Sequence, residues 1–118
     1  MEVEREIVVP APPDEVWSAL TDPARLEEWF ANDVELDPVE GGRGRFRWDD
    51  GDERHAVVIE AVPERRFVLD WDESPDRISR VAIELEPVEA GTRVRVTETL
   101  GAGWSTALSL RALALVPV

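Results

Sequence analysis

The segment ISRVAIELEPVEAGTRVRVTETL, residues 78–100, decides the fold class because its side chains alternate in character along two successive runs. Apolar residues occupy every second position from 81 to 85, and the run 92–100 alternates in the same way. A period of two is typical of a β-strand with one buried and one wet face. Ala90-Gly91 lies between the runs and predicts a turn, so an antiparallel hairpin is expected here.

The chain before this hairpin is divided by turn signals into further β-rich runs. Gly41-Gly42, Asp50-Gly51 and Pro63-Glu64 are turn signals, and Asp-Gly favours a tight hairpin because it tolerates positive φ. In addition to 78–88 and 92–100, the predicted strands span residues 3–9, 34–39, 43–49, 54–62 and 66–72.

Helices are predicted at both ends of this set of strands. Start signals at Pro13 and Asp22 predict two short helices, over residues 13–21 and 23–30. A third helix is predicted over residues 104–116, where the following proline ends it. The order strand, two helices, six strands, helix predicts a single α+β domain that takes up all 118 residues.

Composition excludes several classes of function. The formal charge is −13, from 26 acidic residues against 13 basic ones, and every basic residue is Arg. Such a surface is expected to bind neither nucleic acid nor an anionic membrane, because both need a basic footprint. The chain has no Cys, and no run approaches the roughly 20 apolar residues of a membrane span. A cytoplasmic protein without metal or cofactor is expected.

The inward faces of the predicted strands and helices carry most of the aromatic residues. Large rings with one polar tip suit the rim of a pocket, so we expect a pocket for an apolar small molecule. The alternative is that these rings fill the core, which is the interpretation preferred for Trp17 and Phe67. The apolar residues predicted to line the pocket are Trp29, Phe46, Trp48, Leu69, Trp71, Ile83, Val96, Trp104 and Leu108.

Two carboxylates are candidates for the polar end of this pocket. Glu98 interrupts an otherwise apolar strand face, next to Val96. Glu60 joins it if Val58 faces inward, but the run 55–62 is apolar on both faces and leaves its orientation open. A carboxyl group out of water can serve as a general acid or as a hydrogen-bond anchor. The alternative is an exposed Glu60 and a Glu98 at a frayed strand end.

The order of motifs resembles the START-like (SRPBCC) proteins of the chaperone-ATPase-activator-homologue type. The matching motifs are Ile7–Pro10, Val16–Pro23, Glu28–Phe30, Gly41–Phe46, Asp50-Gly51, Val58–Pro63, Leu69–Trp71, Gly91–Val94 and Gly103-Trp104. The resemblance implies the helix-grip fold, in which a curved seven-stranded antiparallel sheet holds a C-terminal helix across its concave face. It also implies a cavity for apolar ligands between helix and sheet.

The sequence departs from this family at two places. Relatives often have His where this chain has Glu98, so no role of that imidazole transfers. The run 104–116 is short and apolar on all sides, which predicts either a homodimer through this helix or an open pocket. The leading hypothesis is a non-catalytic binder of an apolar or amphipathic molecule. The alternatives are a cyclase- or hydrolase-like enzyme that uses a pocket carboxylate and a chaperone co-factor-like interaction module.

Overall fold

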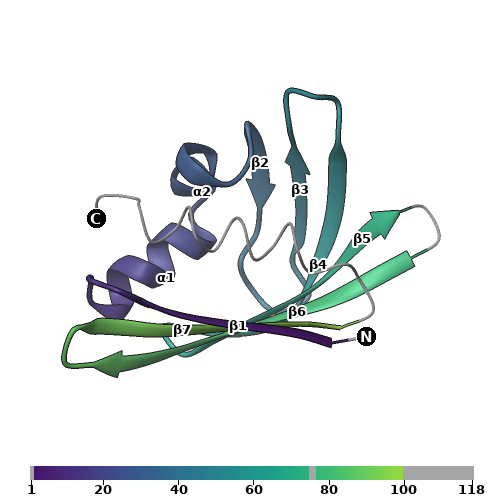
Figure 1. Ribbon diagram of the computed structural model, residues 1–118. Coiled ribbons are helices and arrows are strands. Elements are labelled where there is room, and N and C mark those ends of the chain that lie inside the picture. Colours follow the sequence, from purple (N-terminus) through teal and green to yellow (C-terminus); the bar gives the residue numbers. More distant parts are fainter. Residues whose placement is uncertain (1, 75–76, 100–118) are drawn as a thin grey trace.

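A curved sheet of seven antiparallel strands carries the fold, with two short helices on its concave side (Figure 1). The computed structural model describes residues 2–74 and 77–99. Its elements are β1 (Glu2–Val9), α1 (Pro13–Thr21), α2 (Pro23–Trp29), β2 (Asp33–Leu36), β3 (Arg43–Arg47), β4 (Glu53–Val62), β5 (Arg66–Ser74), β6 (Arg77–Val88) and β7 (Gly91–Thr99). The strand order is β1-β7-β6-β5-β4-β3-β2. The predicted α+β helix-grip class, with its seven-stranded sheet and two helices, is confirmed.

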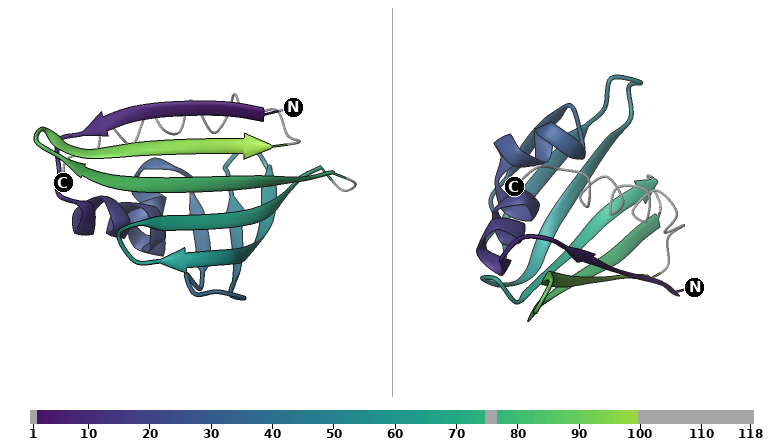
Figure 2. Two further views of the ribbon diagram at one scale, coloured as in Figure 1. Left: turned by 90° about the horizontal axis from the view of Figure 1, so that it is seen from below. Right: turned by 60° about the vertical axis from the view of Figure 1, so that its left-hand side comes forward.

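The first and last described strands lie side by side, so that β1 forms one edge of the sheet next to β7 (Figure 2). The β1–β7 register runs from Glu2 opposite Thr99 to Val9 opposite Thr92. From β7 to β2 every neighbour in the sheet is also a neighbour in sequence, so each connection is a hairpin. The two helices form the connection between the edge strands β1 and β2. They lie over one end of the concave face.

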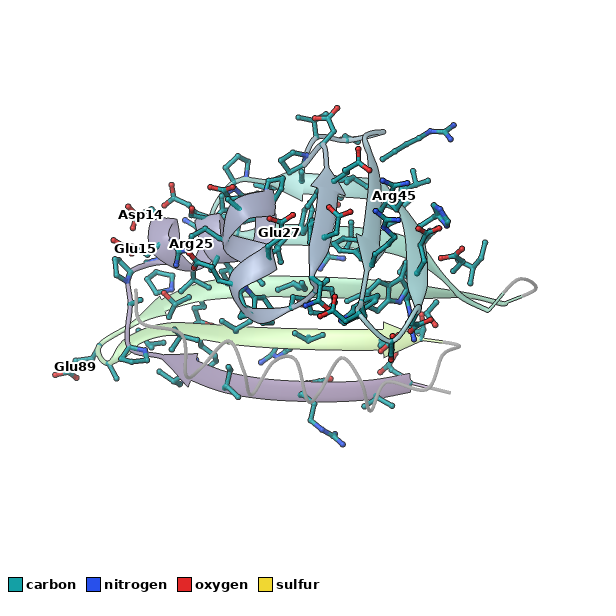
Figure 3. The ribbon with its side chains drawn as sticks, turned by 90° about the horizontal axis from the view of Figure 1, so that it is seen from above. Asp14, Glu15, Arg25, Glu27, Arg45 and Glu89 are labelled. Carbon is teal, nitrogen blue, oxygen red and sulfur yellow. The ribbon has the colours of Figure 1, made fainter. Side chains whose placement is uncertain are left out.

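Backbone sterics and charge set where the helices begin. Pro13 is the first residue of α1, and Asp14 and Glu15 lie in its first turn, where the helix dipole favours negative charge (Figure 3). The Asp22 side chain caps α2 by accepting a hydrogen bond from the Ala24 amide at 3.0 Å. Both predicted helix starts are confirmed.

Side-chain hydrogen bonds fix α2 to the elements on either side of it. The Glu27 carboxylate, which lies on α2 in Figure 3, accepts a hydrogen bond from the Val34 amide of β2 at 2.9 Å. The Trp29 indole N–H donates to the Ala19 carbonyl of α1 at 2.9 Å. These two bonds hold α2 in place even though only Leu26 of this helix is fully buried.

A β-bulge in β4 decides which of its side chains face the core. Val58 lies opposite Leu69, but the next paired residue is Glu60, opposite Val68, so Ile59 is an extra residue. Because side chains alternate with a period of two, the extra residue reverses, for the part of β4 after it, which side chains face inward and which face outward. Ala56 and Val58 are therefore buried before the bulge. Beyond it, Ala61 packs against the core. Both apolar faces seen in the sequence are used, one on each side of the bulge.

Arginine–carboxylate pairs cover the outer face of the sheet. Arg80 binds both oxygens of Asp70 across β5 and β6, at 2.7 and 2.9 Å. Arg93 of β7 contacts Glu6 of β1 at 2.9 Å and Glu86 of β6 at 3.3 Å. Exposed pairs of this kind each contribute less than about 1 kcal/mol, but they keep the convex face polar.

The third predicted helix, over residues 104–116, lies outside the described residues. The same is true of Trp104 and Leu108, which were predicted to line the pocket, and of the homodimer contact expected through this helix. Within residues 2–74 and 77–99, no helix is long and apolar enough to cross a membrane. The cytoplasmic location stays a prediction.

The backbone conformation of Gly91, where the chain turns from β6 into β7, predicts how a substitution there changes stability. Gly91 has φ +140°, and a Cβ at this position would lie 2.0 Å from the Val9 carbonyl oxygen. We expect Gly91→Ala to lower the free energy of unfolding by roughly 3 kcal/mol or more, because both the dihedral angle and the clash oppose it. Chemical denaturation measures this change.

Gly51→Ala is the matched control. Gly51 also has a positive φ, +93°, but a Cβ added there would meet no atom within 4 Å. At Gly51 only the unfavourable dihedral angle opposes alanine, so the free energy of unfolding should fall by about 1 to 2 kcal/mol. Equal losses in the two variants would show that the contact with Val9 is unimportant.

Candidate functional site

A cavity lies between the two helices and the concave face of the sheet. Its volume is about 60 Å³. The described residues that line it come from α1, α2, the residue after α2 and five strands, namely Leu20, Leu26, Trp29, Phe30, Leu36, Phe46, Phe67, Leu69, Trp71, Val81, Ile83 and Val96. No carboxylate, hydroxyl, amide or cationic group belongs to this part of the lining. The cavity therefore suits an apolar guest.

Phe30, the residue that follows α2, organises the aromatic wall of the cavity. Its ring lies 5.4 Å from Trp29, 5.6 Å from Phe46 and 5.5 Å from Trp48, measured between ring centroids. It also stacks on Trp71 at 6.0 Å with an interplanar angle of 14°. Aromatic pairs contribute about 0.5 to 1.5 kcal/mol each beyond burial, so this cluster holds one wall in a fixed shape.

The indole N–H groups of Trp29, Trp48 and Trp71 bind protein acceptors. Trp29 donates to the Ala19 carbonyl at 2.9 Å, and Trp48 donates to the Phe30 carbonyl at 2.8 Å. Trp71 donates to Oε2 of Glu98 at 3.3 Å. Because these polar tips are engaged, the tryptophans of the wall offer the cavity only their apolar faces.

Glu98 is buried on the concave face beside the cavity, with 1 % of its surface exposed. It lies opposite Val81 of β6 and two residues after Val96 on β7, and both valines line the cavity. Its Oε1 atom has no hydrogen-bond partner among the described residues. The carboxyl group thus adjoins the lining without being part of it.

The structure brings six of the predicted site residues together in the lining. These are Trp29, Phe46, Leu69, Trp71, Ile83 and Val96. Sequence reasoning left out six further lining residues, namely Leu20, Leu26, Phe30, Leu36, Phe67 and Val81. Helical spacing in residues 23–30 indicates an inward Leu26 and Phe30, and strand alternation groups Val81 with Ile83, so these three could be found from the sequence, whereas Phe67 is interpreted there as a core residue.

The predicted position of Trp48 in the pocket is wrong. The prediction continued the third strand to residue 49, but β3 ends at Arg47. The Trp48 amide instead donates to the Asp52 carbonyl at 2.9 Å inside the hairpin turn. Its ring packs against Phe30, and Trp48 is not among the described residues that line the cavity.

The predicted position of Glu60 beside Glu98 is also wrong. Val58 faces inward, as that prediction required, but the bulge at Ile59 turns Glu60 to the outer face. There its carboxylate accepts from Arg66 at 2.7 Å, and 42 % of the side chain is exposed. Glu98 is the carboxylate that remains beside the cavity.

Polar groups elsewhere do not form a second centre in the described residues. No group of three or more His, Cys, Asp or Glu side chains there could hold a metal ion. His55 lies between Glu53 and Asp72, at 3.3 and 3.2 Å, with 59 % of its side chain exposed. It occupies the outer face, away from the cavity, as expected of a solvated strand residue.

Solved structures share this architecture. Protein MLL2253 from Mesorhizobium loti superposes with a TM-score of 0.86 at 24 % identity, over 98 % of this chain and 95 % of that one. DynU16, a protein of the dynemicin biosynthetic locus, has a TM-score of 0.82 at 26 % identity, over 97 % of this chain and 46 % of its own. CalU16 from Micromonospora echinospora has a TM-score of 0.77 at 26 % identity, over 97 % of this chain and 73 % of its own.

The family assignment rests on the sequence as well. No curated protein matches the chain. The family model described as "Activator of Hsp90 ATPase homolog 1-like protein" matches residues 10–112. This match runs from the end of β1 to beyond β7, so it includes every described residue that lines the cavity. The chain therefore belongs to the Activator of Hsp90 ATPase homolog 1-like protein family.

Proposed function

We propose that this protein binds a small apolar molecule, or the apolar part of an amphipathic one, in the cavity beneath α2. The observation that carries the proposal is the contrast between cavity and surface. Twelve described side chains line the cavity and all are apolar, in a chain of net charge −13. Apolar cavities exclude water and take up apolar molecules.

The cavity volume limits the size of the guest. About 60 Å³ is well below the roughly 300 to 1,000 Å³ of pockets that enclose drug-sized ligands. One ring or a short alkyl chain is therefore the expected guest, with neighbouring side chains moving to admit it. A larger ligand would leave its remaining part outside the cavity.

The relatives support a role with small molecules. DynU16, which is 26 % identical, comes from the dynemicin biosynthetic locus. The chain spans only 46 % of DynU16, so the likeness supports a shared domain rather than a shared activity. The proposal concerns binding and includes no chemical change of the ligand.

A cavity-filling substitution tests the proposal directly. Val96 lines the cavity and is 5 % exposed, so Val96→Phe places a ring where the guest would lie. We expect ethylbenzene to shift the tryptophan fluorescence of the natural protein and to bind Val96→Phe at least roughly tenfold more weakly. Val57→Phe is the control, because Val57 lies on the outer face and is 42 % exposed. Unchanged binding by Val96→Phe would contradict the proposal.

A cavity-enlarging substitution gives an independent test. Leu69→Ala removes a lining side chain and is expected to cost about 2 to 5 kcal/mol of stability. Saturating ethylbenzene should then raise its melting temperature more than that of the natural protein, because the guest fills the added space.

Leu85→Ala is the matched control for this second test. Leu85 is also buried but does not line the cavity. It should lose stability without gaining any response to ethylbenzene. An equal rise of the melting temperature with ethylbenzene in both variants would mean that ethylbenzene binds outside the cavity.

A further inference from the structure

The Glu98 carboxyl is the least satisfied polar group of the described core. Its Oε1 atom is the one buried side-chain oxygen or nitrogen in residues 2–74 and 77–99 without a hydrogen-bond partner. Its Oε2 atom receives only the Trp71 indole N–H, at 3.3 Å, which is longer than the usual 2.7 to 3.2 Å. An unsatisfied buried polar group is costly, so its presence needs an explanation.

The described part of the protein supplies no positive partner for this carboxyl. Arginine pairs with carboxylates all along the outer face, yet none of the described ion pairs involves Glu98. Arg54, on the same side of the sheet as Trp71, stacks its guanidinium over the Trp71 ring at 4.7 Å instead. The hydrogen-bonding capacity of Oε1 is therefore left for another group.

Glu98 lies next to one end of the cavity. Trp71, Val81 and Val96 all line the cavity, and each is a direct neighbour of Glu98 through a hydrogen bond, the strand register or the same strand face. A polar group of a guest at this end of the cavity would therefore be the nearest available partner for the carboxyl, whose bond to Trp71 is long. The described lining itself contains no carboxylate, hydroxyl, amide or cationic group that would compete for the polar part of a guest.

We propose that the ligand carries a hydroxyl group, which binds Oε1 of Glu98 at the Trp71 end of the cavity. This inference rests on the proposed function and names the class of ligand, an apolar alcohol or phenol. A hydroxyl both donates and accepts, so it pairs with Oε1 whether or not the carboxyl carries a proton. A plain hydrocarbon would leave Oε1 unpaired.

Three probes with one apolar part test the inference on the natural protein. They are ethylbenzene, 2-phenylethanol and the methyl ether of 2-phenylethanol, titrated by tryptophan fluorescence. We expect 2-phenylethanol to bind roughly tenfold more tightly than its ether, which has lost the donor. Equal or tighter binding of the ether overturns the inference, while binding of ethylbenzene alone overturns it and leaves the proposed function in place. Failure of all three probes overturns both.

Variants of Glu98 show whether the preference arises at this residue. Glu98→Leu should weaken the binding of 2-phenylethanol roughly tenfold and leave the binding of ethylbenzene unchanged. Glu98→Gln, which keeps a donor and an acceptor, should retain the preference for the alcohol. Glu60→Leu is the matched control, since Glu60 lies on the outer face of the same sheet. Equal weakening of both probes in Glu98→Leu would indicate a structural role and overturn the inference.

Discussion

The contacts of Trp71 are the constraint on which the cavity depends. Its ring stacks on Phe30 after α2, meets the edge of Phe46 on β3 at 6.2 Å and lies under the Arg54 guanidinium of β4. Its indole N–H reaches Glu98 on β7. One side chain on the central strand β5 therefore ties α2 and both halves of the curved sheet together. The same ring is part of the cavity lining, so these contacts also fix the position of one side of the cavity.

Sequence pattern was enough to predict the fold because each local signal agreed with the next. Period-two alternation located β5, β6 and β7, and the proline and aspartate signals located α1 and α2. The same alternation placed Leu69, Trp71 and Val96 on the inward face, where they line the cavity. In regular strands the backbone period alone sorts side chains, so these residues could be predicted without tertiary information.

The errors occur where the backbone departs from that period. Glu60 was misplaced because a bulge at Ile59 exchanges the faces of β4, and nothing in an evenly apolar run marks an extra residue. Trp48 was misplaced because β3 ends one residue before it, and strand ends depend on the bonds of the hairpin turn. Both positions depend on hydrogen bonds to a partner strand, which a single sequence does not display.

The bulge also bears on how relatives of this protein are compared. If β4 were regular, Ile59 would point outward and Glu60 would lie on the concave side together with Val58. Two homologues with the same residues in this strand can therefore present different chemistry to a ligand, depending only on where the extra residue is accommodated. A column of a sequence alignment does not carry that information. Ligand preferences within the family are best transferred through the strand register, which a superposition of backbones reveals.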